Sequence, residues 1–77
     1  MTQQEFIEEF AAIVNEDAPK ITADTALASL DGWDSVAYLS TLVLIDDQLG
    51  VSVRPEVLQN AATLGDILSA LTPHFSA

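Results

Sequence analysis

The first apolar pattern in the chain predicts a helix over residues 3–15. Apolar side chains recur on one face of this segment, and glutamates occupy the opposite face. The expected buried face is made of Phe6, Ile7, Phe10, Ile13 and Val14, and the polar face carries Glu5, Glu8 and Glu9. Thr2 and Glu5 have the spacing of a capping box, so the helix is expected to begin directly after Thr2. Pro19 follows the segment and cannot continue it.

A second helix is predicted over residues 35–49, with Gly50 at its carboxyl end. At about 100° per residue, its apolar side chains form two stripes. The stripe expected to face the core is Tyr38, Leu42, Ile45 and Leu49, and the second stripe is Val36, Leu39 and Val43. Together they cover about half the circumference, more than the ~100° that a surface helix needs. Two interpretations remain. Either the domain buries both stripes, or the second stripe stays exposed as a docking patch with Asp46 and Asp47 as its acidic rim. Leu44 lies off both stripes.

The remaining segments predict a long connection and two further helices. Residues 17–33 are rich in Pro, Thr, Asp and Ser, and Leu27 and Leu30 are expected to pin this connection to the core. A short third helix is predicted over residues 55–60, since proline suits a first helical turn. Thr63 and Asp66 have capping-box spacing before a fourth apolar helix that ends before Pro73. The pattern therefore predicts an all-α protein with four helices.

Charge narrows the classes of partner. The chain has 77 residues, which we expect to form a single domain over residues 1–77, and it carries 12 acidic against two basic side chains, for a net charge of −10. Such a field opposes nucleic acids and anionic membranes and favours basic partner proteins, although acidity can also serve solubility alone. The aliphatic run at residues 42–45 is too short to insert into a membrane, and no basic signal-peptide start is present. We expect a monomer in the cytoplasm, without disulfides because there is no cysteine.

Ser35 is the side chain with the clearest candidate chemistry. It stands at the first position of the predicted second helix, directly after Asp34, which is suited to cap that helix. A catalytic serine would need a nearby base and an oxyanion hole. His74 is the only histidine, stands at the far end of the chain and is expected to be a solvated surface residue, and there is no Gly-x-Ser-x-Gly motif. The sequence therefore favours a serine that an outside enzyme modifies, and we expect no catalysis by this chain.

Residues 32–36, Gly-Trp-Asp-Ser-Val, resemble the modification motif G-x-D-S-[LIV] of the acyl carrier protein family. The resemblance extends over nearly the whole chain: helix, long loop, motif, short third helix and capped fourth helix. It implies an up-and-down four-helix bundle with a short third helix and a long first loop. It also implies a 4'-phosphopantetheine arm on Ser35, which holds an acyl or aminoacyl group as a thioester.

The resemblance implies roles for the neighbours of Ser35 as well. The modifying transferase or the attached arm would contact Asp34, Gly32 and Val36. Asp34 would also help the transferase to position magnesium. Gly32 is expected to allow a tight turn before the cap, and Trp33 is expected to be partly buried. The implied partners are a phosphopantetheinyl transferase, a loading ligase or transferase, and downstream biosynthetic enzymes with basic docking surfaces.

Some residues depart from the family pattern. Asp31 and Val36 stand where leucines are common, and Ser40 and Thr41 dilute the acidic side of the second helix. These departures favour a dedicated carrier in a secondary-metabolic or modification pathway over general fatty acid synthesis, and Asp34 mildly favours acyl or alanyl transfer over peptidyl transfer. The alternative is an acidic adaptor or inhibitor module that binds a basic protein without any prosthetic group.

Overall fold

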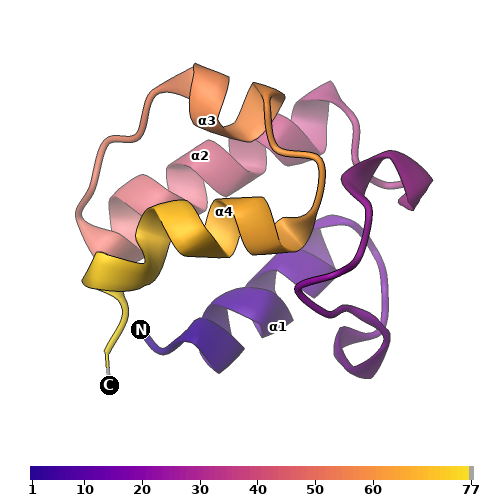
Figure 1. Ribbon diagram of the computed structural model, residues 1–77, viewed down its shortest axis with the longest axis horizontal. Helices are drawn as coiled ribbons and strands as arrows, with labels where there is room; N and C mark the ends of the chain where they lie inside the picture. Colours follow the sequence, from indigo (N-terminus) through magenta and orange to yellow (C-terminus); the bar gives the residue numbers. More distant parts are fainter. Residues whose placement is uncertain (77) are drawn as a thin grey trace.

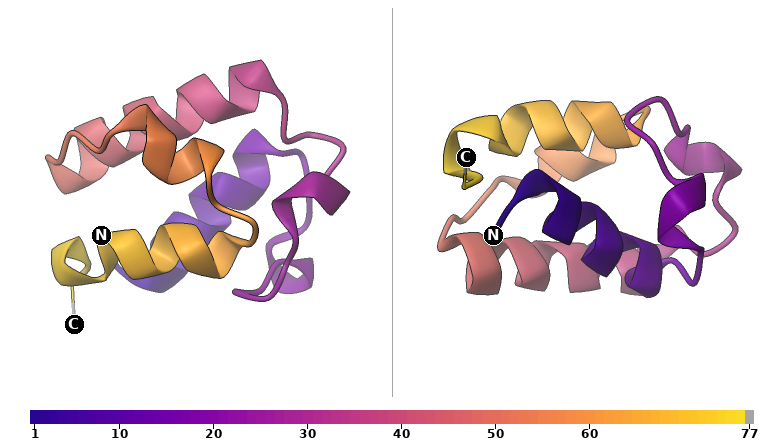
Figure 2. Two further views of the ribbon diagram at one scale, coloured as in Figure 1. Left: turned by 45° about the horizontal axis from the view of Figure 1, so that its top comes forward. Right: turned by 90° about the horizontal axis from the view of Figure 1, so that it is seen from below.

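The computed structural model describes residues 1–76 and shows a helical bundle (Figure 1). Its helices are α1 (Gln3–Ile13), α2 (Ser35–Leu49), α3 (Pro55–Gln59) and α4 (Leu64–Leu71), and three 3-10 turns are η1 (Ala18–Lys20), η2 (Leu27–Ser29) and η3 (Thr72–His74). In the views of Figures 1 and 2, α1, α2 and α4 form the long members of the bundle, and the short α3 lies beside α2 and α4. The predicted all-α class, four helices and short third helix are confirmed. Among residues 1–76, no helix is both long and apolar enough to cross a membrane.

Both predicted capping boxes are present. Thr2 Oγ1 accepts from the Glu5 N–H at 3.1 Å, while the Thr2 N–H donates to the Glu5 carboxylate at 2.8 Å. Thr63 and Asp66 make the same reciprocal pair at the start of α4. The first helix ends at Ile13, two residues before its predicted end. The chain leaves the helix there because Asn15 adopts a left-handed conformation with φ of 59°.

The buried side of α2 differs from the predicted core stripe. Its fully buried side chains are Ala37, Thr41 and Ile45, whereas Tyr38, Leu42 and Leu49 are only partly buried against the core. Small side chains at positions 37 and 41 fit where the helix meets the core. The Thr41 hydroxyl is satisfied there because it donates to the Ala37 carbonyl at 2.9 Å. Assigning Thr41 to the exposed acidic side was therefore wrong. Ser40 is partly exposed and lines a groove against α1.

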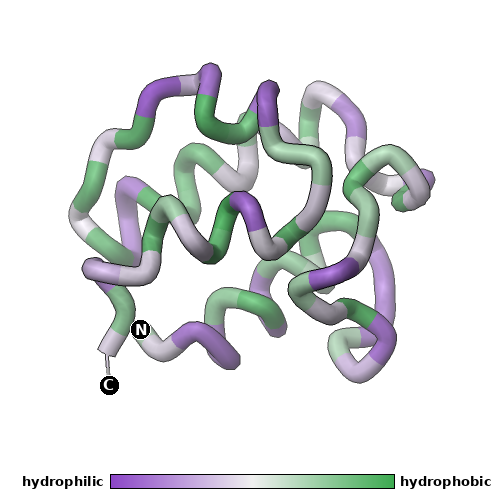
Figure 3. Tube along the Cα trace, in the orientation of Figure 1, coloured by the Kyte–Doolittle hydropathy of each residue, from purple (hydrophilic) through white to green (hydrophobic). Residues whose placement is uncertain are grey.

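A row of aromatic rings runs through the core. Ring centroids are 5.6 Å apart for Phe75 and Phe6, 6.5 Å for Phe6 and Phe10, 5.5 Å for Phe10 and Trp33, and 6.4 Å for Trp33 and Tyr38. Trp33 is partly buried, as predicted. Phe75 is not simply a tail residue, because its ring packs edge-on against the fully buried Phe6. Figure 3 shows hydrophobic and hydrophilic segments alternating along α1 and α4, as expected for helices with one buried face.

The long connection before α2 is held by backbone hydrogen bonds to the start of α4. The Leu27 N–H donates to the Ala62 carbonyl at 3.0 Å, and the Leu64 N–H donates to the Thr25 carbonyl at 3.0 Å. These two bonds form an isolated antiparallel bridge between residues 26 and 63. Leu27 and Leu30 are buried, as predicted. The connection is thus fixed by both side chains and backbone at the point where it leads to Ser35.

Candidate functional site

Ser35 is the first residue of α2, and its side chain is exposed. Asp34 is the N-cap, and its Oδ1 accepts from the Ala37 N–H at 2.9 Å. The N–H groups of Ser35 and Val36 precede the first possible intrahelical bond, so they have no acceptor within the helix. The result is an accessible hydroxyl beside free N–H groups at the positive end of the helix dipole, an arrangement that tolerates an anion.

Gly32 is required by close packing rather than by a special backbone angle. A Cβ atom at this position would lie 2.1 Å from the carbonyl oxygen of Val14, at the end of α1. In the described chain, the glycine with positive φ is Gly50, at 66°, where it ends α2 as predicted. The predicted tight turn at Gly32 is present, since the Trp33 N–H donates to the Leu30 carbonyl at 3.1 Å, and the steric requirement adds to it. Contact with α1 sets the position of the chain three residues before Ser35.

A groove between α2 and α3 opens beside the serine. It has a volume of about 460 Å³ and is lined by Trp33, Asp34, Ser35, Tyr38, Leu58 and Gln59. The Tyr38 hydroxyl donates to the Pro55 carbonyl at 3.2 Å and so joins α2 to the start of α3. A lining with aromatic and aliphatic side chains and one side-chain amide suits a flexible chain that has both methylene and amide groups. The residues around Ser35 therefore fit a pantetheine arm.

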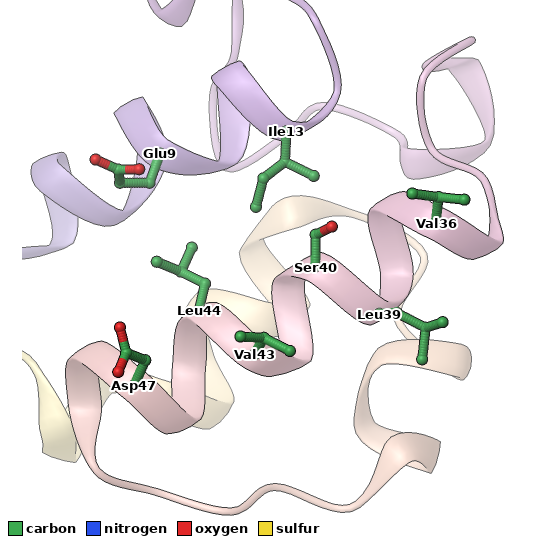
Figure 4. A pocket seen from close by; sticks show the side chains of 8 residues that line it. All are labelled: Glu9, Ile13, Val36, Leu39, Ser40, Val43, Leu44 and Asp47. Atoms are coloured by element: carbon green, nitrogen blue, oxygen red, sulfur yellow. The ribbon is translucent and has the colours of Figure 1, made fainter.

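The second stripe of α2 is exposed. Val36, Leu39 and Val43 retain 69%, 58% and 66% of their accessible surface, and Asp46 and Asp47 are also exposed. Of the two interpretations from the pattern, the structure therefore supports exposure over burial. Leu44, which had no assignment, is partly buried and lines a second groove with Ile13 of α1 (Figure 4).

The structure does not bring His74 to the serine. His74 is exposed in η3, as predicted, and Figures 1 and 2 show η3 at the opposite end of the bundle from the start of α2. Within residues 1–76 there is no cluster of three or more His, Cys, Asp or Glu side chains that could hold a metal ion. Ser35 and His74 thus do not form a nucleophile and base pair.

Two acidic side chains are engaged in helix capping away from Ser35. Hydrogen bonds from the backbone and hydroxyl of Thr2 lower the pKa of Glu5. Those from the N–H groups of Ala62 and Thr63 lower the pKa of Asp66. Each bond stabilises the charged carboxylate. Lys20 forms an exposed ion pair with Asp17 at 3.6 Å, which leaves most of the acidic surplus on the surface.

The helical fold and the exposed serine at a helix start define a carrier-type protein, and comparison with known families agrees. Residues 4–71 match the family described as "Phosphopantetheine attachment site". The chain therefore belongs to the acyl carrier protein family, whose members are non-catalytic carriers with covalently attached 4'-phosphopantetheine. The resemblance of residues 32–36 to the family motif led to the correct family.

Relatives described as acyl carrier proteins are found among mycobacteria. The chain is 36% identical over 58 residues to the acyl carrier protein MbtL of Mycolicibacterium paratuberculosis, an alignment that covers 75% of this chain and 65% of the relative. It is 32% identical over 62 residues to the acyl carrier protein MbtL of Mycobacterium tuberculosis, which covers 80% of this chain and 74% of the relative. The match thus spans just under two thirds of the first relative and more of the second.

Proposed function

We propose that Ser35 bears the 4'-phosphopantetheine group and that this chain presents an acyl or aminoacyl cargo to biosynthetic enzymes. The observation that carries the proposal is the exposed Ser35 hydroxyl at the N-terminus of α2, inside the segment that matches the family. The prosthetic group supplies a terminal thiol that holds the cargo as a thioester. The chain's own contribution is to anchor and orient that group.

The start of α2 suits the anchoring phosphate. The N–H groups of Ser35 and Val36 can donate to a phosphate attached at Ser35 Oγ, and the helix dipole favours its negative charge. The adjacent groove between α2 and α3 is lined by Trp33, Tyr38 and Leu58, and by Gln59, whose amide can form hydrogen bonds. Together these residues would hold the first part of the arm close to the protein.

Asp34 is proposed to serve the modifying transferase. Its Oδ1 is engaged in the helix cap, while within residues 1–76 no hydrogen bond is made by its other carboxylate oxygen. That second oxygen, on an exposed side chain next to Ser35, is suited to help position a magnesium ion brought by the transferase. Gly32 contributes indirectly by fixing this segment against α1.

The proposed partners are a phosphopantetheinyl transferase, a loading ligase or transferase, and downstream enzymes with basic docking surfaces. The exposed Val36, Leu39 and Val43, with Asp46 and Asp47 as an acidic rim, support docking on α2. A dedicated pathway rather than general fatty acid synthesis is favoured by Val36 and by the partly exposed Ser40 of α2. The relatives described as acyl carrier proteins favour an acyl cargo.

The decisive experiment is an intact mass measurement after incubation with coenzyme A, magnesium and a promiscuous phosphopantetheinyl transferase. The wild-type chain should gain one phosphopantetheinyl group and Ser35→Ala none. Ser40→Ala, which removes another hydroxyl from the same helix, should be modified like the wild type. An unmodified wild type, or a gain that survives Ser35→Ala, would refute the proposal.

A second candidate is an adaptor or inhibitor module without a prosthetic group, favoured by the exposed apolar stripe on an acidic protein. It predicts that Ser35→Ala retains full activity in a cellular assay of the pathway, while Leu39→Asp abolishes it. The carrier proposal predicts instead that Ser35→Ala abolishes activity, so this variant distinguishes the two candidates. Because Leu39 is exposed, its substitution should leave the melting temperature nearly unchanged, which separates a docking defect from unfolding.

A further inference from the structure

The α3 side of the groove beside Ser35 is a short helix with few attachments. α3 has five residues, and the side chain of its N-cap, Arg54, makes no capping hydrogen bond. A helix of this length is not stable by itself, so its position depends on contacts with the rest of the protein. Among the five residues of α3, all of which the structure describes, the buried side chain is that of Leu58, at 1% exposure. One apolar side chain sets how close α3 lies to the core, but by itself it does not set the orientation of the helix.

Tyr38 supplies a second attachment. Its hydroxyl donates to the carbonyl of Pro55, the first residue of α3, at 3.2 Å. Within residues 1–76, this is the hydrogen bond that joins α3 to another helix, because the other hydrogen bonds of residues 55–59 have both partners between residues 54 and 61. Leu58 and the Pro55 carbonyl therefore hold α3 at two points, and two points set its orientation as well as its distance from the core.

The ring of Tyr38 is itself held by the aromatic row. Its centroid lies 6.4 Å from that of Trp33, with the two ring planes at 70°, an edge-on packing. Trp33 in turn packs on the fully buried Phe10 at 5.5 Å. Tyr38 is thus fixed at its ring by residues that connect to the core and at its hydroxyl by α3. It links the two sides of the groove.

We infer that Tyr38 is a positioning residue for the arm: its hydroxyl holds α3 in the orientation in which Leu58 and Gln59 border the first part of the arm. The arm is the occupant of this groove because Ser35, its attachment point, is one of the lining residues. Trp33 lines the α2 side, whereas Leu58 and Gln59 form the α3 side. Without the hydrogen bond, the α2 side stays in place and the α3 side moves away from the arm. This inference rests on the proposed function and deepens it, since it gives a role to a residue outside the modification motif.

The test variant is Tyr38→Phe, which keeps the ring and removes the hydroxyl. It is compared with the wild type by NMR, both isotope-labelled and bearing the arm. The first measurement is amide exchange in α3, at Val57 and Asn60, whose N–H groups donate within this segment at 3.0 and 2.9 Å. Exchange should be about two- to tenfold faster in the variant, the range for the loss of one neutral hydrogen bond.

The second measurement reports on the arm itself. Nuclear Overhauser effects from the methyl groups of the arm should reach both Trp33 and Leu58 in the wild type. In Tyr38→Phe the effects at Trp33 should persist, while those at Leu58 should fall to about half or less. A purely structural role of Tyr38 would lower the melting temperature and leave the ratio of the two sets unchanged.

Thr72→Val is the matched control. It removes a hydroxyl that donates to the Leu68 carbonyl at 2.8 Å, also a hydrogen bond from a side chain to the backbone. Thr72 begins η3, at the opposite end of the bundle from the start of α2. Amide exchange in α3 and the contacts of the arm should therefore remain as in the wild type.

Several results would overturn the inference: unchanged exchange in α3 of Tyr38→Phe, an unchanged ratio of the effects at Trp33 and Leu58, or equal changes in Thr72→Val. A wild-type arm that contacts neither side of the groove would also overturn it. Intact mass of the same samples separates the two proposals. An attached arm with unchanged contacts in the variant would refute the role of Tyr38 alone. A wild type that gains no arm would refute the carrier function, and the positioning role with it.

Discussion

Substitution of Gly32 by alanine tests whether contact between the motif loop and α1 holds the modification site in place. The added Cβ would lie 2.1 Å from the Val14 carbonyl oxygen, 2.7 Å from its carbonyl carbon and 2.9 Å from its Cα. The closest pair would have to separate by about 1.3 Å to reach an ordinary contact of 3.4 Å. All three neighbours are backbone atoms, so no rotamer change relieves the clash. We expect a cost of about 3 kcal/mol, the upper end of the range for overpacking.

For a domain of this size, each kcal/mol lowers the melting temperature by about 4–8 °C, so Gly32→Ala should lower it by roughly 12–24 °C. Gly50→Ala is the matched control. Its Cβ would meet nothing within 4 Å, and the cost there comes only from φ of 66°. Backbone strain of about 1 kcal/mol predicts that Gly50→Ala lowers the melting temperature by roughly 4–8 °C. Thermal unfolding followed by circular dichroism measures both. If Gly32→Ala lowers the melting temperature no more than Gly50→Ala does, the inferred clash with the Val14 backbone is wrong.

The two remaining predictions concern helix caps. Asp34→Ala should lower the free energy of unfolding by about 1 kcal/mol, while Asp34→Asn keeps the cap but loses the charge. Both should slow arm transfer, and an Asn variant modified at the wild-type rate would contradict the proposed magnesium role. Because hydrogen bonds lower the pKa of Asp66, its carboxylate stabilises the fold fully above the ordinary pKa of 3.8, and this contribution is lost as the pH falls through the lower folded-state pKa. In urea unfolding, the free energy of unfolding of the wild type should exceed that of Asp66→Asn by a constant amount from pH 7 to 5, and this difference should shrink below pH 3.8. A difference that grows on acidification would contradict a lowered pKa of Asp66 in the folded state.

Sequence reasoning was most reliable where the signal is local. The caps at Thr2 and Thr63, the N-cap at Asp34 and the left-handed end of α2 at Gly50 depend on residues within one turn of one another. It was less reliable for the buried side of α2. Hydropathy favoured the large apolar residues, whereas Ala37 and Thr41 are buried because small side chains fit where the helix meets the core.

Contacts between distant segments could not be predicted. No local pattern shows that Leu27 and Ala62 would be joined by a backbone hydrogen bond, or that Phe75 would pack on Phe6. The role of Gly32 is of the same kind, because the atoms that exclude a Cβ belong to Val14. The groove between α1 and α2 likewise brings together Glu9 and Asp47, which are far apart in the sequence and lie on two different helices.

The sequence by itself determined the helices, their caps, the acidic charge and the position of Ser35 at the start of α2, because these follow from neighbours along the chain. Only the tertiary structure decided which faces are covered. It left Val36, Leu39 and Val43 exposed, since packing of α2 on the core uses Ala37, Thr41 and Ile45 on another side of the helix. Burial is a property of the whole assembly of helices, whereas a cap is a property of a single turn.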